Sequence, residues 1–418
     1  METRRRGRLS LEHQGGPAER HGDPVLAERL ADALQAVHDA PRDPLTHGFH
    51  TYPARMHYAI ARRVLEQWSE PRTRVLDPFC GSGTVLVEAR RLGLRSCGVD
   101  LNPVGLRVAE VKCALRSQPE RERFAELASA VVEASLERVQ GRVKVLAPLS
   151  AAERQWYLPH VLLEMAGLHA EIEALEPGFD QRALQMVFSS ILVKYSRQRS
   201  ETAPVQVQQK VGKTVVSRFF GRKSEELLQR WTALAEDSPP QGVPPKLSEG
   251  DARGLRKLLG GWQFDLVLSS PPYGGTYDYV DHHARRYPWL GLSDQPLRDG
   301  EIGARRRLSE GRGAARVWER EVEQMLRSTA EVLSARGEVV LLIGDAEVGG
   351  RRIEADRQLQ SLAGRAGLQV VASAAQRRPD WGGGTPRREH LVALRHAEAK
   401  TPGKPESPQQ PDPRPPKG

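Results

Sequence analysis

A strand, turn and helix unit near residue 74 places the strongest constraint on the fold. Residues 74–79 read as a buried strand, Gly81 and Gly83 form a turn, residues 84–92 read as a helix, and residues 96–100 read as a second strand. Two strands joined by a crossover helix lie parallel in one sheet. The chain is therefore predicted to be an α/β protein with a parallel sheet.

The strand pattern resumes only after a long interruption. Residues 264–269, 338–343 and 389–395 read as further strands, with a weaker one at 369–372. Residues 118–235 between them read as mostly helical. A basic stretch inside that segment contains Lys194, Arg197, Arg199, Lys210, Lys213, Arg218, Arg222 and Lys223. The sequence thus predicts a sheet interrupted by a helical, basic insertion.

These shifts in pattern divide the chain into five regions. The chain has 418 residues, which is enough for two or three domains or for one domain with a large insertion. The predicted regions are a disordered basic tail at 1–22, the first half of the sheet domain at 23–117, the helical insertion at 118–240, the second half at 241–396 and a disordered Pro-rich tail at 397–418.

Composition narrows the class of protein. The net charge of +9 suits a polyanionic partner, although an Arg-rich composition that reflects only nucleotide bias explains it equally well. No apolar run is long enough to span a membrane, and the N-terminus lacks a secretory signal, so a cytoplasmic location is expected by default. The three cysteines show no Cys-x-x-Cys spacing, so neither a zinc cluster nor any other metal site is predicted.

The glycine turn has the features of a ligand-binding loop. Gly81 and Gly83 let the backbone approach a ligand closely, and the next helix begins with free N–H groups. Asp77 starts the loop and can hold a cationic amino group, while Asp100 ends the next strand where an acidic residue reaches ribose hydroxyls. The turn lacks the further residues of a dinucleotide or phosphate loop, so a phosphate ligand is disfavoured. A glycine turn without any ligand is the alternative.

A second motif, Ser270-Pro-Pro-Tyr273, follows the strand at 264–269. The Ser270 hydroxyl and the Pro271 carbonyl can accept hydrogen bonds from a planar amine. Pro271 and Pro272 stiffen the loop, and Tyr273 offers a flat ring on which a base can stack. The alternative is a rigid Pro-Pro turn with no ligand. Together, the two motifs describe methyl transfer from a sulfonium donor to an amino nitrogen.

These residues resemble the S-adenosylmethionine-dependent DNA amino-methyltransferases that act on cytosine N4 or adenine N6. Residues 77–84 resemble motif I, Asp100 the acid of motif II, Asp251 the carboxylate of motif III, and residues 270–273 motif IV. Residues 50–56 resemble a segment just upstream of motif I. The resemblance implies a Rossmann-like class I methyltransferase sheet with a large, mostly helical insertion between motif I and motif IV. A Ser-Pro-Pro-Tyr form is typical of the cytosine-N4 enzymes of this family.

The resemblance also implies a set of site residues. The implied cofactor is S-adenosylmethionine, held by Tyr52, Pro53, Asp77, Pro78, Phe79, Cys80, Gly81, Ser82, Gly83, Thr84, Asp100, Asn102 and Asp251. The implied catalytic residues are Ser270, Pro271, Pro272 and Tyr273. The order of the motifs makes the basic insertion the candidate target-recognition region. Double-stranded DNA is the implied partner, and a cognate restriction endonuclease is a further expected partner.

The expected activity is methylation of the exocyclic N4 of cytosine in DNA. Adenine N6 in DNA and guanine N2 in tRNA stay open as acceptors, and so does a non-catalytic nucleic-acid-binding protein on the same scaffold. Methylation of a cytosine ring carbon needs a thiolate, which that family places after a proline. None of Cys80, Cys97 and Cys113 follows a proline, so this reaction is excluded. Asp278, Asp281, His282 and His283 are interpreted as polar residues beside the pocket.

Overall fold

The computed structural model describes residues 16–53, 55–200, 203–208, 210–240, 242–275, 278–308, 313–348, 350–378 and 387–397. Most of the two tails that were expected to be disordered, residues 1–15 and 398–418, lies outside the described residues.

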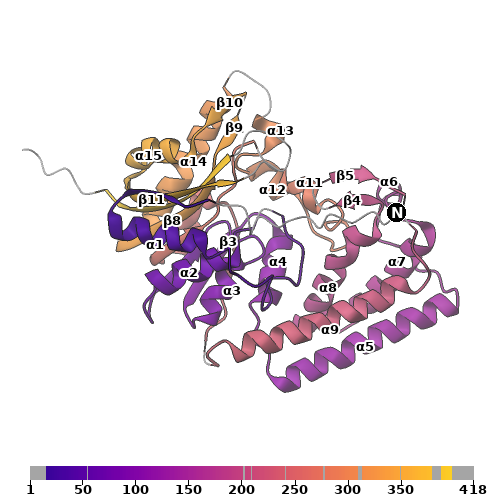
Figure 1. The fold of residues 1–418 in the computed structure, drawn as a ribbon. Coiled ribbons are helices and arrows are strands. Elements are labelled where there is room, and N and C mark those ends of the chain that lie inside the picture. The colour runs from indigo at the N-terminus through magenta and orange to yellow at the C-terminus, as the bar shows by residue number, and fades with distance from the viewer. Residues whose placement is uncertain are drawn as a thin grey trace, which may run out of the picture.

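One sheet organises the first and last parts of the chain. Figure 1 labels β3, β8 and β11 of this sheet. Among the described residues it has eight strands in the order β1-β11-β12-β8-β7-β2-β3-β6. The parallel strands are β2 (Arg74–Asp77), β3 (Arg95–Asp100), β6 (Lys246–Glu249), β7 (Phe264–Ser269) and β8 (Leu333–Gly344). Three more strands are antiparallel to their neighbours. The strand β12 (Arg387–His396) pairs with β8, β11 (Leu368–Arg378) pairs with β12, and β1 (Glu19–Gly22) pairs with β11. The predicted Rossmann-like sheet is confirmed, with an antiparallel extension at one edge.

The strand β1 corrects the expected extent of the N-terminal tail. Residues 19–22 were predicted to be disordered, but they pair with β11, with Glu19 opposite Ala375 and Gly22 opposite Ala372. All four residues of β1 are exposed, so they carry no alternating apolar pattern from which a strand could be read. The strand forms because its backbone pairs with the N–H and C=O groups at the edge of β11.

Helices cover both faces of the sheet, and the alternation along each strand shows which face is which. The helices α1 (Pro24–Gln35), α2 (Tyr58–Trp68) and α3 (Thr84–Arg91) share a core with Val75, Val340 and Leu342. The helices α10 (Leu255–Leu259), α14 (Ala314–Val332) and α15 (Ala355–Ala363) share another core with Leu76 and Leu341. Neighbouring residues of β2 and β8 therefore point into opposite cores.

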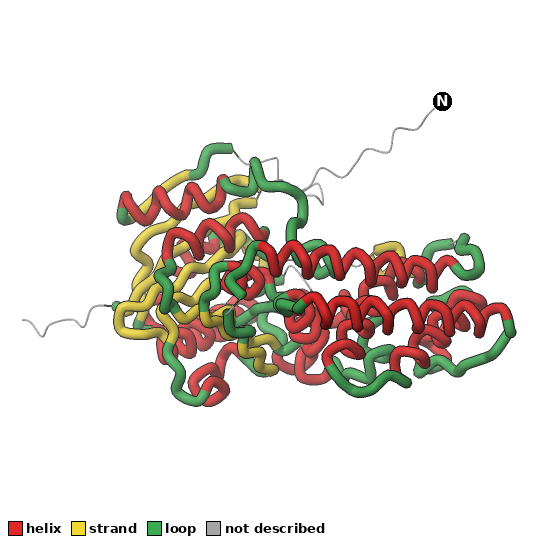
Figure 2. Tube along the Cα trace, turned by 90° about the horizontal axis from the view of Figure 1, so that it is seen from below, coloured by secondary structure: helices red, strands yellow, loops and turns green. Residues whose placement is uncertain are grey.

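The insertion forms the other half of the molecule, which is almost entirely helical (Figure 2). Its helices are α5 (Gln118–Gln140), α6 (Ala151–Arg154), α7 (Pro159–Glu173), α8 (Phe179–Tyr195) and α9 (Val215–Glu236). A hairpin of β4 (Gln198–Ser200) and β5 (Ala203–Gln206) departs from the expected helical pattern.

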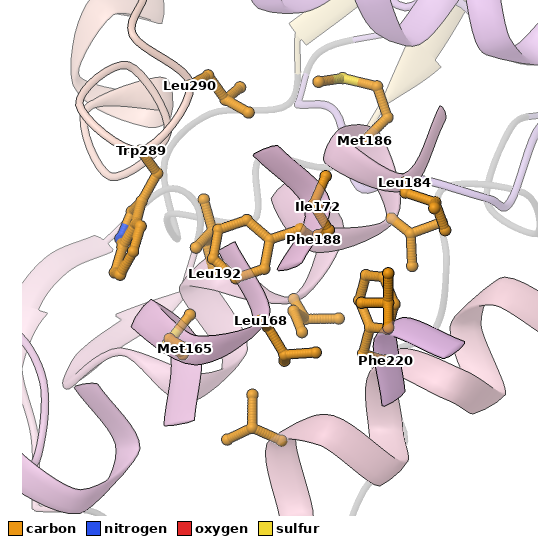
Figure 3. Packing of buried hydrophobic residues seen from close by; sticks show 14 of the residues in the cluster. Met165, Leu168, Ile172, Leu184, Met186, Phe188, Leu192, Phe220, Trp289 and Leu290 are labelled. Carbon is orange, nitrogen blue, oxygen red and sulfur yellow. The ribbon is translucent and has the colours of Figure 1, made fainter. Parts of the chain in front are cut away.

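The core of the insertion includes residues from both flanking parts of the chain. Phe188 and Phe220 pack in one cluster with Trp289 and Leu290, which follow motif IV (Figure 3). Phe49, upstream of motif I, belongs to the same cluster, as do three valines of α4 (Pro103–Lys112). The insertion is therefore anchored to the segments that flank the candidate site.

The remaining elements are short. They are α11 (Tyr279–His283), α12 (Gln295–Gly300), α13 (Arg305–Leu308), β9 (Ala346–Val348), β10 (Arg351–Ile353) and the 3-10 turns η2 (Ala252–Gly254) and η3 (Gly364–Ala366). None of the helices in the described part of the chain combines the length and apolar character of a membrane span.

Candidate methyltransferase site

A pocket opens at the carboxyl ends of β2, β3, β6 and β7, which is where open parallel sheets bind their ligands. The predicted cofactor residues that line it are Tyr52, Asp77, Pro78, Phe79, Cys80, Gly81, Ser82, Thr84, Asp100, Asn102 and Asp251. Ser270 and Pro272 of motif IV also line it. The structure thus brings the two motifs to one cavity.

Pro53 and Gly83 were expected at the cofactor and are not among the lining residues. Gly83 has a φ of +82° and precedes α3. A Cβ there would lie 2.8 Å from the Cβ of Ala109 on α4. Gly83 therefore allows α3 and α4 to pack closely, and this packing explains the glycine without a ligand.

Gly81 lines the pocket and lies against Tyr52. Its φ is +46°, and a Cβ would lie 3.0 Å from the Tyr52 ring. Two hydroxyl oxygens beside it, Ser82 Oγ and Thr84 Oγ1, are buried without a hydrogen-bond partner. Buried polar atoms normally have partners, so their presence in the wall of this pocket fits a polar ligand.

Asp77 lies almost fully buried at the end of β2. Its Oδ1 accepts hydrogen bonds from Ser269 Oγ at 2.6 Å and from the Phe79 amide at 3.1 Å. Burial raises the pKa of Asp77 to about 7, because these two bonds only partly offset the loss of solvation. A cation bound in the pocket would compensate the ionised carboxylate.

Asp100 orders the loop from the neighbouring strand. Its Oδ2 accepts from the Gly81 amide at 2.7 Å and its Oδ1 from the Asn102 amide at 2.8 Å. Burial raises the pKa of Asp100 to about 6. The carboxylate therefore ties β3 to the glycine turn and to the start of α4.

Asn102 links three segments of the site. As the N-cap of α4, its Oδ1 accepts from the Val104 amide at 3.1 Å. The same oxygen accepts from the hydroxyl of Tyr287 at 3.1 Å, and Nδ2 donates to the hydroxyl of Tyr52 at 3.1 Å. The sequence identified Asn102 as a cap, but not these long-range contacts.

Asp251 faces the same pocket with its carboxylate already engaged. Its Oδ1 accepts from the Arg253 amide at 2.8 Å and from Arg253 Nε at 2.9 Å. Its Oδ2 also accepts from Arg253 Nε at 3.0 Å and from Arg253 Nη2. Three N–H groups of Arg253 therefore use three of about four acceptor positions, which leaves one for a donor from a ligand.

Motif IV spans two adjoining pockets. Pro271 and Tyr273 line a second, mostly apolar pocket. Phe79, Pro272 and Ile302 line both pockets. The structure therefore places Ser270 on the cofactor side of Pro272 and Tyr273 on its far side.

Sequence reasoning missed Glu301 and Tyr279, which both line the first pocket. Glu301 is 2% exposed, and its Oε1 accepts from the Tyr279 amide at 2.7 Å. Burial raises the pKa of Glu301. Residues 278–308 contain only short helices with no regular period, so the only usable signal was the nearness of Tyr279 to motif IV.

The polar residues after motif IV do not assemble a metal centre. Within the described ranges, no group of three or more His, Cys, Asp or Glu residues is placed to hold a metal ion. Asp278 Oδ1 accepts from the Arg306 amide at 3.0 Å. The His283 ring lies 4.7 Å from the ring of Tyr52, centroid to centroid, so it supports the pocket wall.

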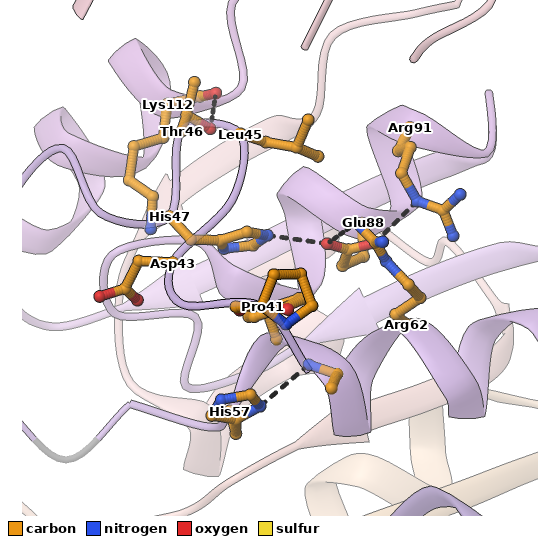
Figure 4. A network of polar contacts seen from close by, with 12 residues as sticks. Pro41, Asp43, Leu45, Thr46, His47, His57, Arg62, Glu88, Arg91 and Lys112 are labelled. Carbon is orange, nitrogen blue, oxygen red and sulfur yellow. Dashed lines mark hydrogen bonds and ion pairs between the residues drawn. The ribbon is translucent and has the colours of Figure 1, made fainter. Parts of the chain in front are cut away.

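A buried ionic network holds the segment upstream of motif I (Figure 4). His47 Nε2 lies 2.7 Å from Glu88 Oε1, and Glu88 also accepts from Arg62 and Arg91. Burial lowers the pKa of His47 to about 4, so the neutral ring donates to Glu88. Burial alone would raise the pKa of Glu88, but the bonds from His47 and Arg62 bring it to about 2. The loop that carries Tyr52 is thereby fixed to α2 and α3.

Comparison with known proteins agrees with this arrangement. Residues 30–110 match the family model described as DNA methylase, of the N6/N4 type. The type II methyltransferase M.BsoBI of Geobacillus stearothermophilus is 22% identical over 303 residues, covering 63% of this chain and 56% of that protein. M.AvaI of Nostoc sp. is 23% identical over 254 residues, covering 57% and 52%. M.MvaI of Kocuria varians is 42% identical over 71 residues, covering 16% of each chain.

The chain spans about half the length of the relatives M.BsoBI and M.AvaI. The cofactor of the family is S-adenosylmethionine, and the orphaned hydroxyls and buried carboxylates of the pocket fit it. The family match over residues 30–110 and the type II methyltransferase relatives support the resemblance to the DNA amino-methyltransferases of the N6/N4 type.

Proposed function

We propose that this protein transfers a methyl group from S-adenosylmethionine to the exocyclic N4 of cytosine in DNA. One observation carries the proposal: Ser270 and Pro272 of motif IV line the same pocket as Asp77 and Asp100 of the donor site. A methyl donor and an amine acceptor held there would meet at the carboxyl end of β7. The serine at position 270, where adenine-N6 enzymes often have aspartate, favours cytosine.

The pocket offers a partner for each polar part of the cofactor. Asp77 would hold the cationic amino group, and Asp100 the ribose hydroxyls. Asp251 would accept from the adenine amine, and the hydroxyls of Ser82 and Thr84 would find their missing partners. When bound, S-adenosylmethionine supplies an electrophilic methyl group on a sulfonium sulfur.

Motif IV would activate the acceptor amine. Ser270 Oγ and the Pro271 carbonyl would accept hydrogen bonds from its two N–H groups, so that the nitrogen lone pair points at the donor. The base must leave the duplex to reach this site, and stacking on Tyr273 would stabilise the extruded base. The N–CH3 bond would form as the methyl–sulfur bond breaks, so the sulfonium would leave as the neutral thioether S-adenosylhomocysteine. The nitrogen would release one proton to solvent, with no covalent bond to the protein.

Labelled methyl transfer followed by nucleoside mass spectrometry tests the proposal. Duplex DNA and tRNA are incubated with the protein and labelled S-adenosylmethionine, then digested to nucleosides. We expect N4-methylcytosine from DNA. N6-methyladenine would move the acceptor to adenine, and N2-methylguanosine would move it to RNA. Cofactor binding without transfer to either polymer would instead support a non-catalytic nucleic-acid-binding protein.

The insertion, residues 118–240, is the proposed DNA-reading region. Lys194 and Arg222 are exposed and both lie near the Phe219 ring, with Lys194 Nζ 3.5 Å and the Arg222 guanidinium carbon 5.2 Å from its centroid. Lys223 Nζ donates to Glu226 at 2.6 Å. The relatives are type II methyltransferases by name, so a cognate restriction endonuclease stays a prediction.

Replacing both Lys194 and Arg222 with alanine is expected to weaken DNA binding and to flatten its salt dependence. Each lost phosphate contact lowers the slope of log K against log salt by about 0.9. The slope for the double variant should therefore be smaller by about 1.8, as measured in a salt titration followed by fluorescence anisotropy. Alanine at Arg95 and Arg336, exposed near the amino ends of β3 and β8, serves as the control. An equal loss of slope in the control pair would contradict the assignment.

A further inference from the structure

The ring of Tyr273 lies across a pair of residues on two neighbouring strands. Gly344 ends β8 and Glu389 lies in β12, and the two residues are directly opposite in the antiparallel register. The Tyr273 hydroxyl donates to Glu389 Oε1 at 3.1 Å. Residues about 70 and 116 positions away in sequence therefore meet the aromatic ring of motif IV.

Gly344 provides the space that the ring occupies. A Cβ at position 344 would lie 2.8 Å from Tyr273 Cε2 and 3.0 Å from Cδ2. Contacts this short do not occur between real Cβ atoms and ring carbons, so any side chain at 344 would displace the ring.

The opposite face of the same strand pair is also fixed. His390 Nε2 lies 3.1 Å from Asp345 Oδ1, and both side chains are buried. Asp345 also accepts from the Ala355 amide at 3.2 Å. The contact between His390 and Asp345 joins the end of β8 to β12 next to the Gly344–Glu389 pair. It therefore stabilises the strand pair on the face opposite Tyr273.

We propose that Gly344 and Glu389 are positioning residues that set the ring of Tyr273 in the plane against which the target base stacks. This role rests on the proposed function, since it concerns the acceptor half of the site. Glu389 acts only through the Tyr273 hydroxyl, and Gly344 acts only by leaving room for the ring. Neither residue lines the cofactor pocket.

A double-mutant cycle tests the role of Glu389. Tyr273→Phe removes the hydroxyl and keeps the ring, while Glu389→Ala removes the acceptor. Each single change is expected to lower kcat/KM for DNA by about tenfold, the size of one hydrogen bond to a charged group. The double variant should be no worse than either single variant. Glu389→Gln keeps an acceptor oxygen and should restore activity to within about twofold of the wild type.

Two further measurements separate positioning from general damage. A 2-aminopurine at the target position reports base extrusion by fluorescence, and Glu389→Ala should reduce this signal while the Kd for S-adenosylmethionine stays unchanged. Glu347→Ala removes an exposed carboxylate in β9, three residues after Gly344, and should change neither readout.

Gly344→Ala tests the space beneath the ring. It is expected to reduce the extrusion signal and kcat/KM for DNA by at least about tenfold. Gly364→Ala is the matched control, because a Cβ at 364 meets nothing within 4 Å and its φ is −59°.

The outcomes distinguish the two proposals. Additive losses in the cycle, or full activity in Gly344→Ala, would overturn the positioning role in a protein that still methylates DNA. A wild-type protein that methylates neither DNA nor RNA would overturn the proposed function and this role together. The same cycle measured by urea unfolding would then still report whether Tyr273 and Glu389 are coupled.

Discussion

Asp77→Asn is expected to weaken binding of S-adenosylmethionine by about 100-fold or more and to stabilise the cofactor-free protein at pH 8. The amide oxygen of asparagine can still accept from Ser269 Oγ and from the Phe79 amide, so the local hydrogen bonds survive. Only the negative charge is lost. That charge is the proposed partner of the cofactor's amino group.

The gain in stability follows from the raised pKa of Asp77. The pKa is about 7 in the folded protein against the ordinary 3.8, so between these values the folded state binds more protons than the unfolded state. The contribution of Asp77 to the free energy of unfolding is therefore fully present below pH 3.8 and is lost as the pH rises through 7. About three pKa units correspond to an upper value of about 4 kcal/mol at pH 8. Asp100, with its pKa raised to about 6, contributes in the same direction.

Urea unfolding of the cofactor-free protein at pH 5 and pH 8, with calorimetry for the cofactor, measures both effects. The wild type should also lose affinity for the cofactor by about tenfold per pH unit below 7, as Asp77 becomes protonated. The asparagine variant should lose this dependence. Asp265→Asn is the control on β7, because burial alone would raise the pKa of Asp265 but the Arg74 amide and the other bonds lower it. A destabilised Asp77→Asn protein with unchanged cofactor affinity would refute the assignment.

Local patterns explain which parts of the fold were predictable. Residues 74–100 carry strand and helix periods that need no tertiary context, and β2, α3 and β3 formed where the pattern placed them. The strand β1 escaped because its residues are exposed and its pairing with β11 depends on an edge formed some 350 residues later. Pairing across such a distance leaves no local signal.

The site divides in the same way. Asp77 and Asp100 were found because parallel strands bring their carboxyl ends to one edge. Glu301 was missed because its place in the pocket wall comes with a contact to the Tyr279 backbone, which no sequence period reveals. Gly81 and Gly83 looked equivalent in the sequence, but one approaches Tyr52 in the pocket and the other allows two helices to pack. Sequence spacing identifies the glycine turn, but it does not show which glycine faces the pocket and which one allows the helices to pack.

Tyr273→Ala is expected to lower kcat/KM for DNA by about 100-fold, more than the loss expected of Tyr273→Phe, because stacking of a base on an aromatic ring contributes about 1–3 kcal/mol. Tyr273 lines the second pocket and not the cofactor pocket, so the Kd for S-adenosylmethionine should stay within about twofold of the wild type. Steady-state kinetics with a duplex substrate and calorimetry with the cofactor measure the two quantities.

Tyr273→Phe is the control for this change, since it keeps the ring and should lose only the smaller share that depends on Glu389. A larger loss in the alanine variant than in the phenylalanine variant would assign the difference to stacking. Full activity of Tyr273→Ala would remove the ring from the mechanism. An equal loss of cofactor affinity would instead mean that motif IV supports the donor pocket through Pro272, which lines both cavities.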